Sequence, residues 1–161
     1  MTRVFLLVLT LFLASFFAGL LPEGFVPPDL WFLYALAVAL WSRPASGLLF
    51  AFGAGLVADL VGGGYLGIMA VGLVSAAYVA QGLASWVSLD EPVGWAVVYL
   101  GAYLAKWAGV FAVVYVLSLF AVGPWDFLEV ALKEAAVTAV FAPFYLVLAR
   151  RVLEREGERA H

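Results

Sequence analysis

The sequence contains no cysteine, and its single histidine, His161, is the last residue. Disulfides, thiol nucleophiles and thiolate metal sites are therefore excluded, and an imidazole-based active site is not expected. Charged residues make up only 12% of the chain, whereas they form about a quarter of a soluble domain. The net charge of −3, without a basic patch ahead of the C-terminal tail, argues against nucleic-acid binding. These shortages remove most hydrolase, protease and metalloenzyme chemistry, so we predict neither an enzyme nor a cofactor or metal site.

Apolar side chains are abundant instead and make up 66% of the 161 residues. A soluble protein of this composition has too few polar groups to cover its surface, so lipid is the expected solvent for much of it. A helix needs about 20 apolar residues to cross a hydrocarbon core of about 30 Å. We predict an all-α integral membrane protein with a single six-helix transmembrane domain over residues 1–161. The predicted spans are about 4–21, 30–41, 45–61, 66–86, 93–122 and 127–148, followed by a short cytoplasmic tail at 149–161.

The second and third predicted spans are shorter than a membrane, and two interpretations compete for them. They are either a re-entrant pair or true spans shortened by local thinning of the bilayer or by packing. With six spans, the basic residues near span ends all fall on one side, while the opposite loops carry acids. The basic residues are Arg3, Arg43, Arg150, Arg151 and Arg155, and the acids are Glu23, Asp29 and Asp126. This positive-inside pattern favours six spans with both termini in the cytoplasm.

Several charged residues fall within the predicted spans, where an unpaired charge costs at least about 2.5–3.5 kcal/mol. Counting residues along the spans places Asp59 and Lys106 at a similar depth in the outer half of the membrane. The sixth span brings Glu129, Lys133 and Glu134 into its outer third. We expect Asp59 to pair with Lys106 or with Lys133, and Glu129 can pair with Lys133 at i, i+4.

Three roles remain open for these charges. They lock the helices together or reach toward the headgroups, they line a proton or ion path, or they dock a partner. Outside the spans, Asp29 follows two prolines and is well placed to cap the helix that begins after it.

The glycine-rich stretch 53–67 separates the third and fourth predicted spans. Its residues 62–67 match the pattern G-x-G-x-x-G, but a dinucleotide site needs that pattern between a strand and a helix. Small residues also recur at helical spacing, as at Ala51 and Gly55 and at Gly63 and Gly67. Such spacing lets membrane helices approach backbone to backbone. The glycines therefore predict tight turning and close helix packing, with Asp59 inside that packing.

The same stretch carries a resemblance to a known family. It reads G-x-G-L-x-x-D-x-x-x-G-x-x-L-G, from Gly53, Gly55, Leu56, Asp59, Gly63, Leu66 and Gly67. Together with six short spans in about 160 residues, Pro28 before the second span and Tyr78 in the fourth, it resembles the rod-shape-determining membrane protein MreD. The layout matches over the whole chain, but the motif is specific only over about residues 44–80.

This resemblance implies a non-enzymatic component of the bacterial inner membrane that belongs to the cell-elongation machinery. It would bind the bitopic protein MreC and through it connect to MreB and to the peptidoglycan polymerase–transpeptidase pair. The family fold is similar to the substrate-binding subunits of energy-coupling-factor transporters, so a vitamin-type binding subunit is the alternative. The structural or partner-contact candidates are Gly53, Gly55, Asp59, Gly63, Gly67, Lys106 and Lys133. Membrane lipids are the other expected partners.

Overall fold

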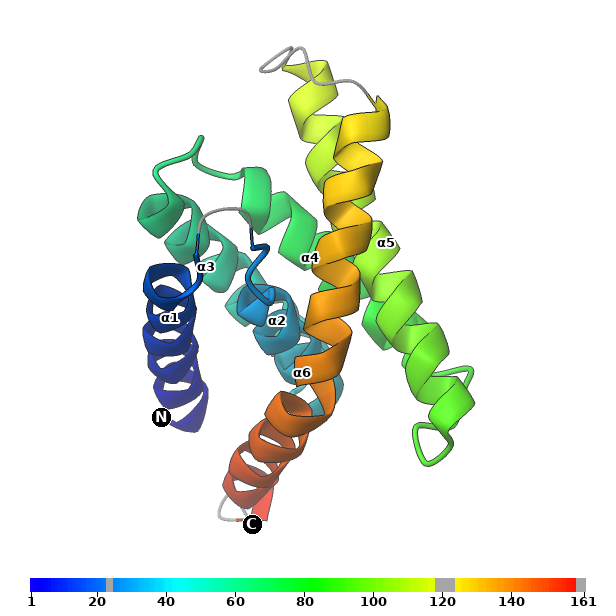
Figure 1. The fold of residues 1–161 in the computed structure, drawn as a ribbon. Helices are drawn as coiled ribbons and strands as arrows, with labels where there is room; N and C mark the ends of the chain where they lie inside the picture. The colour runs from blue at the N-terminus through cyan, green and yellow to red at the C-terminus, as the bar shows by residue number, and fades with distance from the viewer. Residues whose placement is uncertain (23–24, 118–123, 159–161) are drawn as a thin grey trace.

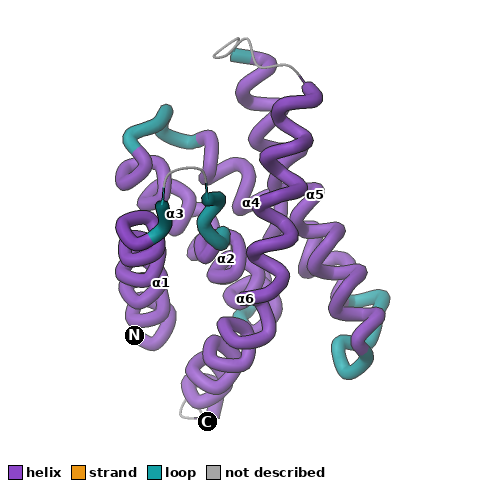
Figure 2. Tube along the Cα trace, in the orientation of Figure 1, coloured by secondary structure: helices purple, strands orange, loops and turns teal. Residues whose placement is uncertain are grey.

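In the computed structural model, residues 1–22, 25–117 and 124–158 are described, and over these residues the chain forms six helices and no strand. The prediction of an all-α protein is therefore confirmed for this part of the chain. Short loops join the second helix to the third, the third to the fourth and the fourth to the fifth, and the start of the first helix and the end of the sixth lie at the same end of the bundle (Figures 1 and 2). The helices are α1 Thr2–Leu20, α2 Leu30–Trp41, α3 Pro44–Gly62, α4 Ile68–Ala84, α5 Pro92–Val116 and α6 Pro124–Glu158.

Within the described residues, four helical segments are long and apolar enough to cross a membrane, namely α1, α3, α5 and residues Leu128–Leu153 of α6. The other two helices are apolar but shorter. At 1.5 Å per residue, the 12 residues of α2 give a length of about 18 Å, and the 17 residues of α4 give about 25 Å. The helices are thus consistent with a membrane protein, and the crossing of a membrane by all six stays a prediction.

Helix ends lie where the sequence places strong start and stop signals. α2 occupies the predicted range 30–41, and its N-cap is Asp29, whose Oδ1 accepts a hydrogen bond from the Phe32 N–H at 3.0 Å, as predicted. The predicted end of the fifth span at 122 lies outside the described residues, because α5 is described only to Val116. α6 continues to Glu158, so most of the predicted tail is helical. The tail consists largely of good helix formers of alternating charge, which explains this continuation.

The short helix α2 lies at the centre of the bundle. It packs against all five other helices, and residues 32–38 have no exposed surface. Such all-round burial explains why α2 is apolar on every face, since a helix with a solvated side would carry a polar stripe. The core of the protein is therefore built around α2 (Figure 1).

α4 lies between α3 and α5, with its most extensive packing against α5. Glycines allow α4 to pack closely against both α3 and α5. A Cβ atom at Gly55 of α3 would overlap the backbone of Ala70 in α4, and one at Gly109 of α5 would lie 3.4 Å from the Cα atom of Gly72 in α4. The predicted role of small residues in close helix packing is thus seen at both faces of α4.

α6 changes direction in its C-terminal half, as Figure 1 shows. Pro143 lies inside the helix there. Proline has no N–H for the helical ladder and its ring crowds the preceding turn, so it bends a helix.

Candidate functional site

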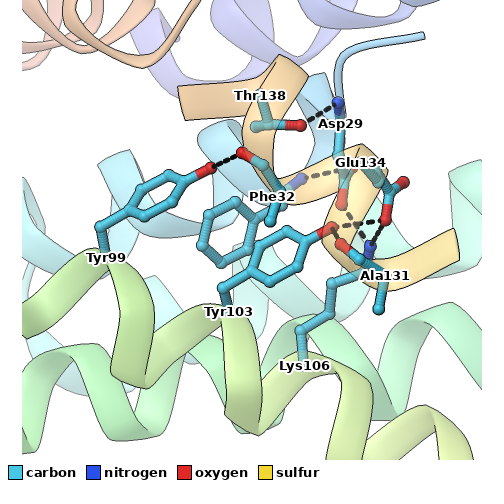
Figure 3. A network of polar contacts seen from close by, with 9 residues as sticks. Asp29, Phe32, Tyr99, Tyr103, Lys106, Ala131, Glu134 and Thr138 are labelled. Carbon is cyan, nitrogen blue, oxygen red and sulfur yellow. Dashed lines mark hydrogen bonds and ion pairs between the residues drawn. The ribbon is translucent and has the colours of Figure 1, made fainter. Parts of the chain in front are cut away.

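A buried cluster of charged side chains joins three separate parts of the chain. Lys106 of α5 is only 1% exposed, and its ammonium group binds the carboxylates of Asp29 and Glu134. Asp29 precedes α2, and Glu134 lies on α6 with its Oε2 atom 3.1 Å from the Lys106 Nζ atom. Figure 3 shows the three side chains converging from these elements.

A shell of hydrogen bonds holds the two carboxylates in place (Figure 3). The Tyr103 hydroxyl, one turn before Lys106 on α5, donates to Glu134 Oε2 at 2.7 Å. The backbone N–H of Asp29 donates to the Thr138 hydroxyl at 2.8 Å, which ties the start of α2 to α6. The ammonium group also lies 4.6 Å from the centre of the Trp107 ring, within the range of a cation–π contact. Each charged group of the cluster therefore has several partners from different elements.

The cluster contains two carboxylates and one ammonium group, so its formal charge is −1 when all three are ionised. A buried ion pair adds little net stability by itself, but removing one partner leaves a buried charge uncompensated and costs about 3–5 kcal/mol. The cluster therefore holds the start of α2, α5 and α6 together through buried ion pairs. Among the residues that the structure describes, no group of three His, Cys, Asp or Glu side chains is placed to hold a metal ion.

Asp59 lies elsewhere, and the predicted pairing of Asp59 with Lys106 or Lys133 is wrong. Its Oδ2 atom accepts from the Gly67 N–H at 2.7 Å, and its Oδ1 atom accepts from the Met69 N–H at 3.0 Å. Asp59 is near the C-terminal end of α3, and the chain turns back at once, so the free N–H groups at the start of α4 are its nearest donors. Lys106 lies on α5, which α4 separates from α3.

The predicted glycine candidates divide into three kinds. Gly63 and Gly67 have positive φ angles of 67° and 103°, so they form the turn that glycine adopts without steric cost. Gly55 is the position of close contact between α3 and α4. Gly53, by contrast, faces open space, and a Cβ atom there would touch nothing within 4 Å.

Lys133 lies outside the buried cluster. Its Nζ atom is 2.6 Å from Glu129 Oε1 one turn earlier on α6, in the i, i+4 pair that the sequence allows, and its side chain is 60% exposed. Lys133 and Glu134 are neighbours in sequence, but adjacent helical positions point about 100° apart. Only Glu134 faces the bundle interior.

A groove between α5 and α6 has a volume of about 750 Å³. Its lining is almost wholly apolar. α6 contributes four alanines, Pro143 and larger side chains, α5 contributes two aromatic and two aliphatic ones, and α2 contributes one tryptophan. The lining includes Trp41, Trp95, Tyr99, Leu100, Ala135, Ala136, Ala139, Ala142, Pro143 and Arg150.

No family model, curated protein or solved structure matches the chain. The resemblance to MreD therefore rests on the glycine–aspartate motif and the layout of the helices.

The sequence analysis missed Asp29 and Glu134 as the partners of Lys106. It also missed Tyr103, which binds Glu134, and Thr138, which binds Asp29. Two helical patterns contained the signal. On α5, Tyr99, Tyr103 and Lys106 follow the spacing i, i+4, i+7, which puts their side chains on one face. On α6, Glu134 and Thr138 are similarly spaced. Two polar faces on apolar helices are expected to meet, because neither is stable against lipid.

Proposed function

We propose that the protein is a non-enzymatic membrane scaffold of the MreD type in the bacterial cell-elongation machinery. It binds the single-pass protein MreC and in this way supports lateral peptidoglycan synthesis. The observation that carries this proposal is that the glycine–aspartate motif, on which the resemblance rests, connects α3 to α4. Asp59 caps the start of α4, Gly63 and Gly67 turn the chain, and Gly55 lets α3 touch α4. A motif with these contacts supports a rigid scaffold.

The buried cluster supports the same proposal. The Lys106 ammonium group is engaged by two carboxylates, and Glu134 also accepts from Tyr103. These contacts fix the relative positions of α2, α5 and α6. A scaffold needs such rigidity to present one constant surface to its partner.

The proposed topology has all six helices crossing the inner membrane, with both termini in the cytoplasm. The start of α1 and the end of α6 lie at the same end of the bundle (Figure 1), as an even number of crossings requires. Near that end, the Arg3 guanidinium group of α1 donates to the Ser46 hydroxyl at the start of α3. The positive-inside rule then assigns this end to the cytoplasm.

The alternative function, a vitamin-binding transporter subunit, is less well supported. Such a subunit takes up its ligand from outside the cell. The α5–α6 groove instead runs toward Arg150, which the same rule places on the cytoplasmic side.

Affinity purification of the tagged chain from native bacterial membranes, followed by mass spectrometry, tests the proposal. We expect MreC in an amount comparable to that of the tagged chain. Gly55→Val, which forces α3 away from α4, should lower the recovery of MreC, while Gly53→Ala should not. Size-exclusion chromatography checks that both variants stay monodisperse. Recovery of a transporter ATPase pair or a bound vitamin, without MreC, would overturn the proposal.

A further inference from the structure

The α5–α6 groove results from the way in which the two helices contact each other. The Tyr103 hydroxyl shares its one hydrogen between Glu134 and the Ala131 carbonyl, which is 3.2 Å away, and the Tyr99 hydroxyl donates to the Ala135 carbonyl at 3.0 Å. These bonds tie the helices together on one side of the groove. Beyond that point α6 presents alanines toward α5, and Pro143 bends it. The methyl groups of alanine are too small to fill the space opposite the large side chains of α5.

The size of the groove limits what can occupy it. A water-sized group takes up about 30 Å³ in a liquid, so a volume of about 750 Å³ holds about 25 methylene-sized groups by that measure. This is enough for one fatty-acyl chain. A membrane-spanning helix about 10 Å wide and about 30 Å long has a volume of about 2,400 Å³, so most of it would remain outside. The groove therefore fits a lipid chain better than a protein helix.

The two ends of the groove differ in chemistry. Toward Leu132 the lining is apolar, and at the other end Arg150 contributes a guanidinium group. Trp41 and Trp95 line the groove as well, with ring centres 5.9 Å apart. Tryptophan rings favour the depth of the lipid headgroups, and a guanidinium group binds a phosphate through paired N–H donors. Basic pockets between membrane helices on the cytoplasmic side bind anionic headgroups in this way.

We propose that the groove between α5 and α6 binds one anionic phospholipid. One acyl chain lies along Ala135, Ala139 and Pro143, and the phosphate group contacts Arg150. The positive charge at the end of an apolar groove selects a negatively charged lipid over a zwitterionic one. This inference does not depend on the proposed scaffold function, because it requires only that α5 and α6 lie in a bilayer.

Native mass spectrometry of the full chain, purified in a mild detergent, tests this proposal with added phosphatidylglycerol and, separately, phosphatidylcholine. We expect the wild-type chain to retain one phosphatidylglycerol molecule and to bind phosphatidylcholine more weakly. Arg150→Gln should weaken phosphatidylglycerol binding about fivefold, the effect of one cation near an anionic lipid. The matched control is Arg151→Gln, because Arg151 is also exposed but does not line the groove.

A second pair of variants tests the place of the acyl chain. Ala139→Leu places a larger side chain in the path of the acyl chain and should reduce the amount of retained lipid. Ala108→Leu makes the same change at an exposed position of α5 outside the groove and should have no effect. Equal thermal stability of the two variants excludes misfolding as the cause of the loss.

Equal binding of both lipids, or equal effects of Arg150→Gln and Arg151→Gln, would overturn the proposal. It would also be overturned if Ala139→Leu expelled a co-purified single-pass protein while leaving the retained lipid unchanged, because a protein helix would then be the occupant.

Discussion

Asp29 and Asp59 are both buried aspartates at helix ends, but they have different roles. They are 5% and 4% exposed, and each accepts hydrogen bonds from backbone N–H groups at the start of a helix. Asp29 uses one oxygen to cap α2 and the other to bind Lys106, which comes from the distant helix α5. Both oxygens of Asp59 are engaged by the turn that follows it. The first aspartate therefore joins helices far apart in the chain, and the second joins two consecutive ones.

The difference shows that burial of an acid does not reveal the nature of its partner. A carboxylate in a membrane protein needs donors, and a helix N-terminus supplies several N–H groups without any basic side chain. Asp59 has such donors eight residues away in the chain. The first turn of α2 gives Asp29 one N–H, so its second oxygen is available for Lys106.

The largest effect is expected for Lys106→Met. It leaves Asp29 and Glu134 facing each other without a cation, and the free energy of unfolding should fall by about 3–5 kcal/mol. SDS-induced unfolding in mixed micelles, followed by circular dichroism, measures the change. Lys133→Met is the control, because the exposed pair with Glu129 should contribute little. Equal losses for the two lysines would contradict the assignment of Lys106 as the central residue.

An intermediate effect on the free energy of unfolding is expected at the contact between α3 and α4, which positions the N–H donors of Asp59. Gly55→Ala places a methyl group against the backbone of Ala70, and such overpacking should destabilise the bundle by about 1–3 kcal/mol. Gly53→Ala adds the same group to open space in the same helix and should be neutral or stabilise by up to about 1 kcal/mol. The same unfolding titration compares them, and a larger loss for Gly53→Ala would show that the α3–α4 contact is placed wrongly.

The smallest effect, and the sharpest comparison of the two aspartates, comes from double-mutant cycles with Lys106→Met. Asp29→Asn and Lys106→Met should couple by about 1 kcal/mol or more, because the two residues share an interaction. Asp59→Asn and Lys106→Met should be additive within about 0.5 kcal/mol, because they share no partner. Unfolding free energies of the single and double variants give both couplings, and the reverse result would restore the Asp59–Lys106 pair.

The sequence predicted the helices well where their ends have local causes. Asp29 after two prolines, and Pro44 after Ser42-Arg43, define both ends of α2, and glycines define the turn between α3 and α4. These signals act within a few residues, so they can be read without knowing the fold.

Pairing across the bundle could not be predicted in the same way. Counting residues gives the depth of Asp59 and Lys106 but not the direction in which each side chain points, nor which helix lies between them. α4 separates the two, and nothing near either residue indicates this. The choice between Lys133 and Glu134 depended on the rotation of α6, which is set by packing. The α5–α6 groove also depends on helix placement, so no stretch of sequence predicts it.

The central position of α2 has a consequence for the order in which the protein is assembled. α2 is synthesised well before α6, yet α6 covers part of its surface. The residue that caps α2 is also held by α6, since the Asp29 N–H donates to the Thr138 hydroxyl. A nascent chain that ends before α6 therefore has an incomplete core, and α2 reaches its final environment only after α6 has been synthesised.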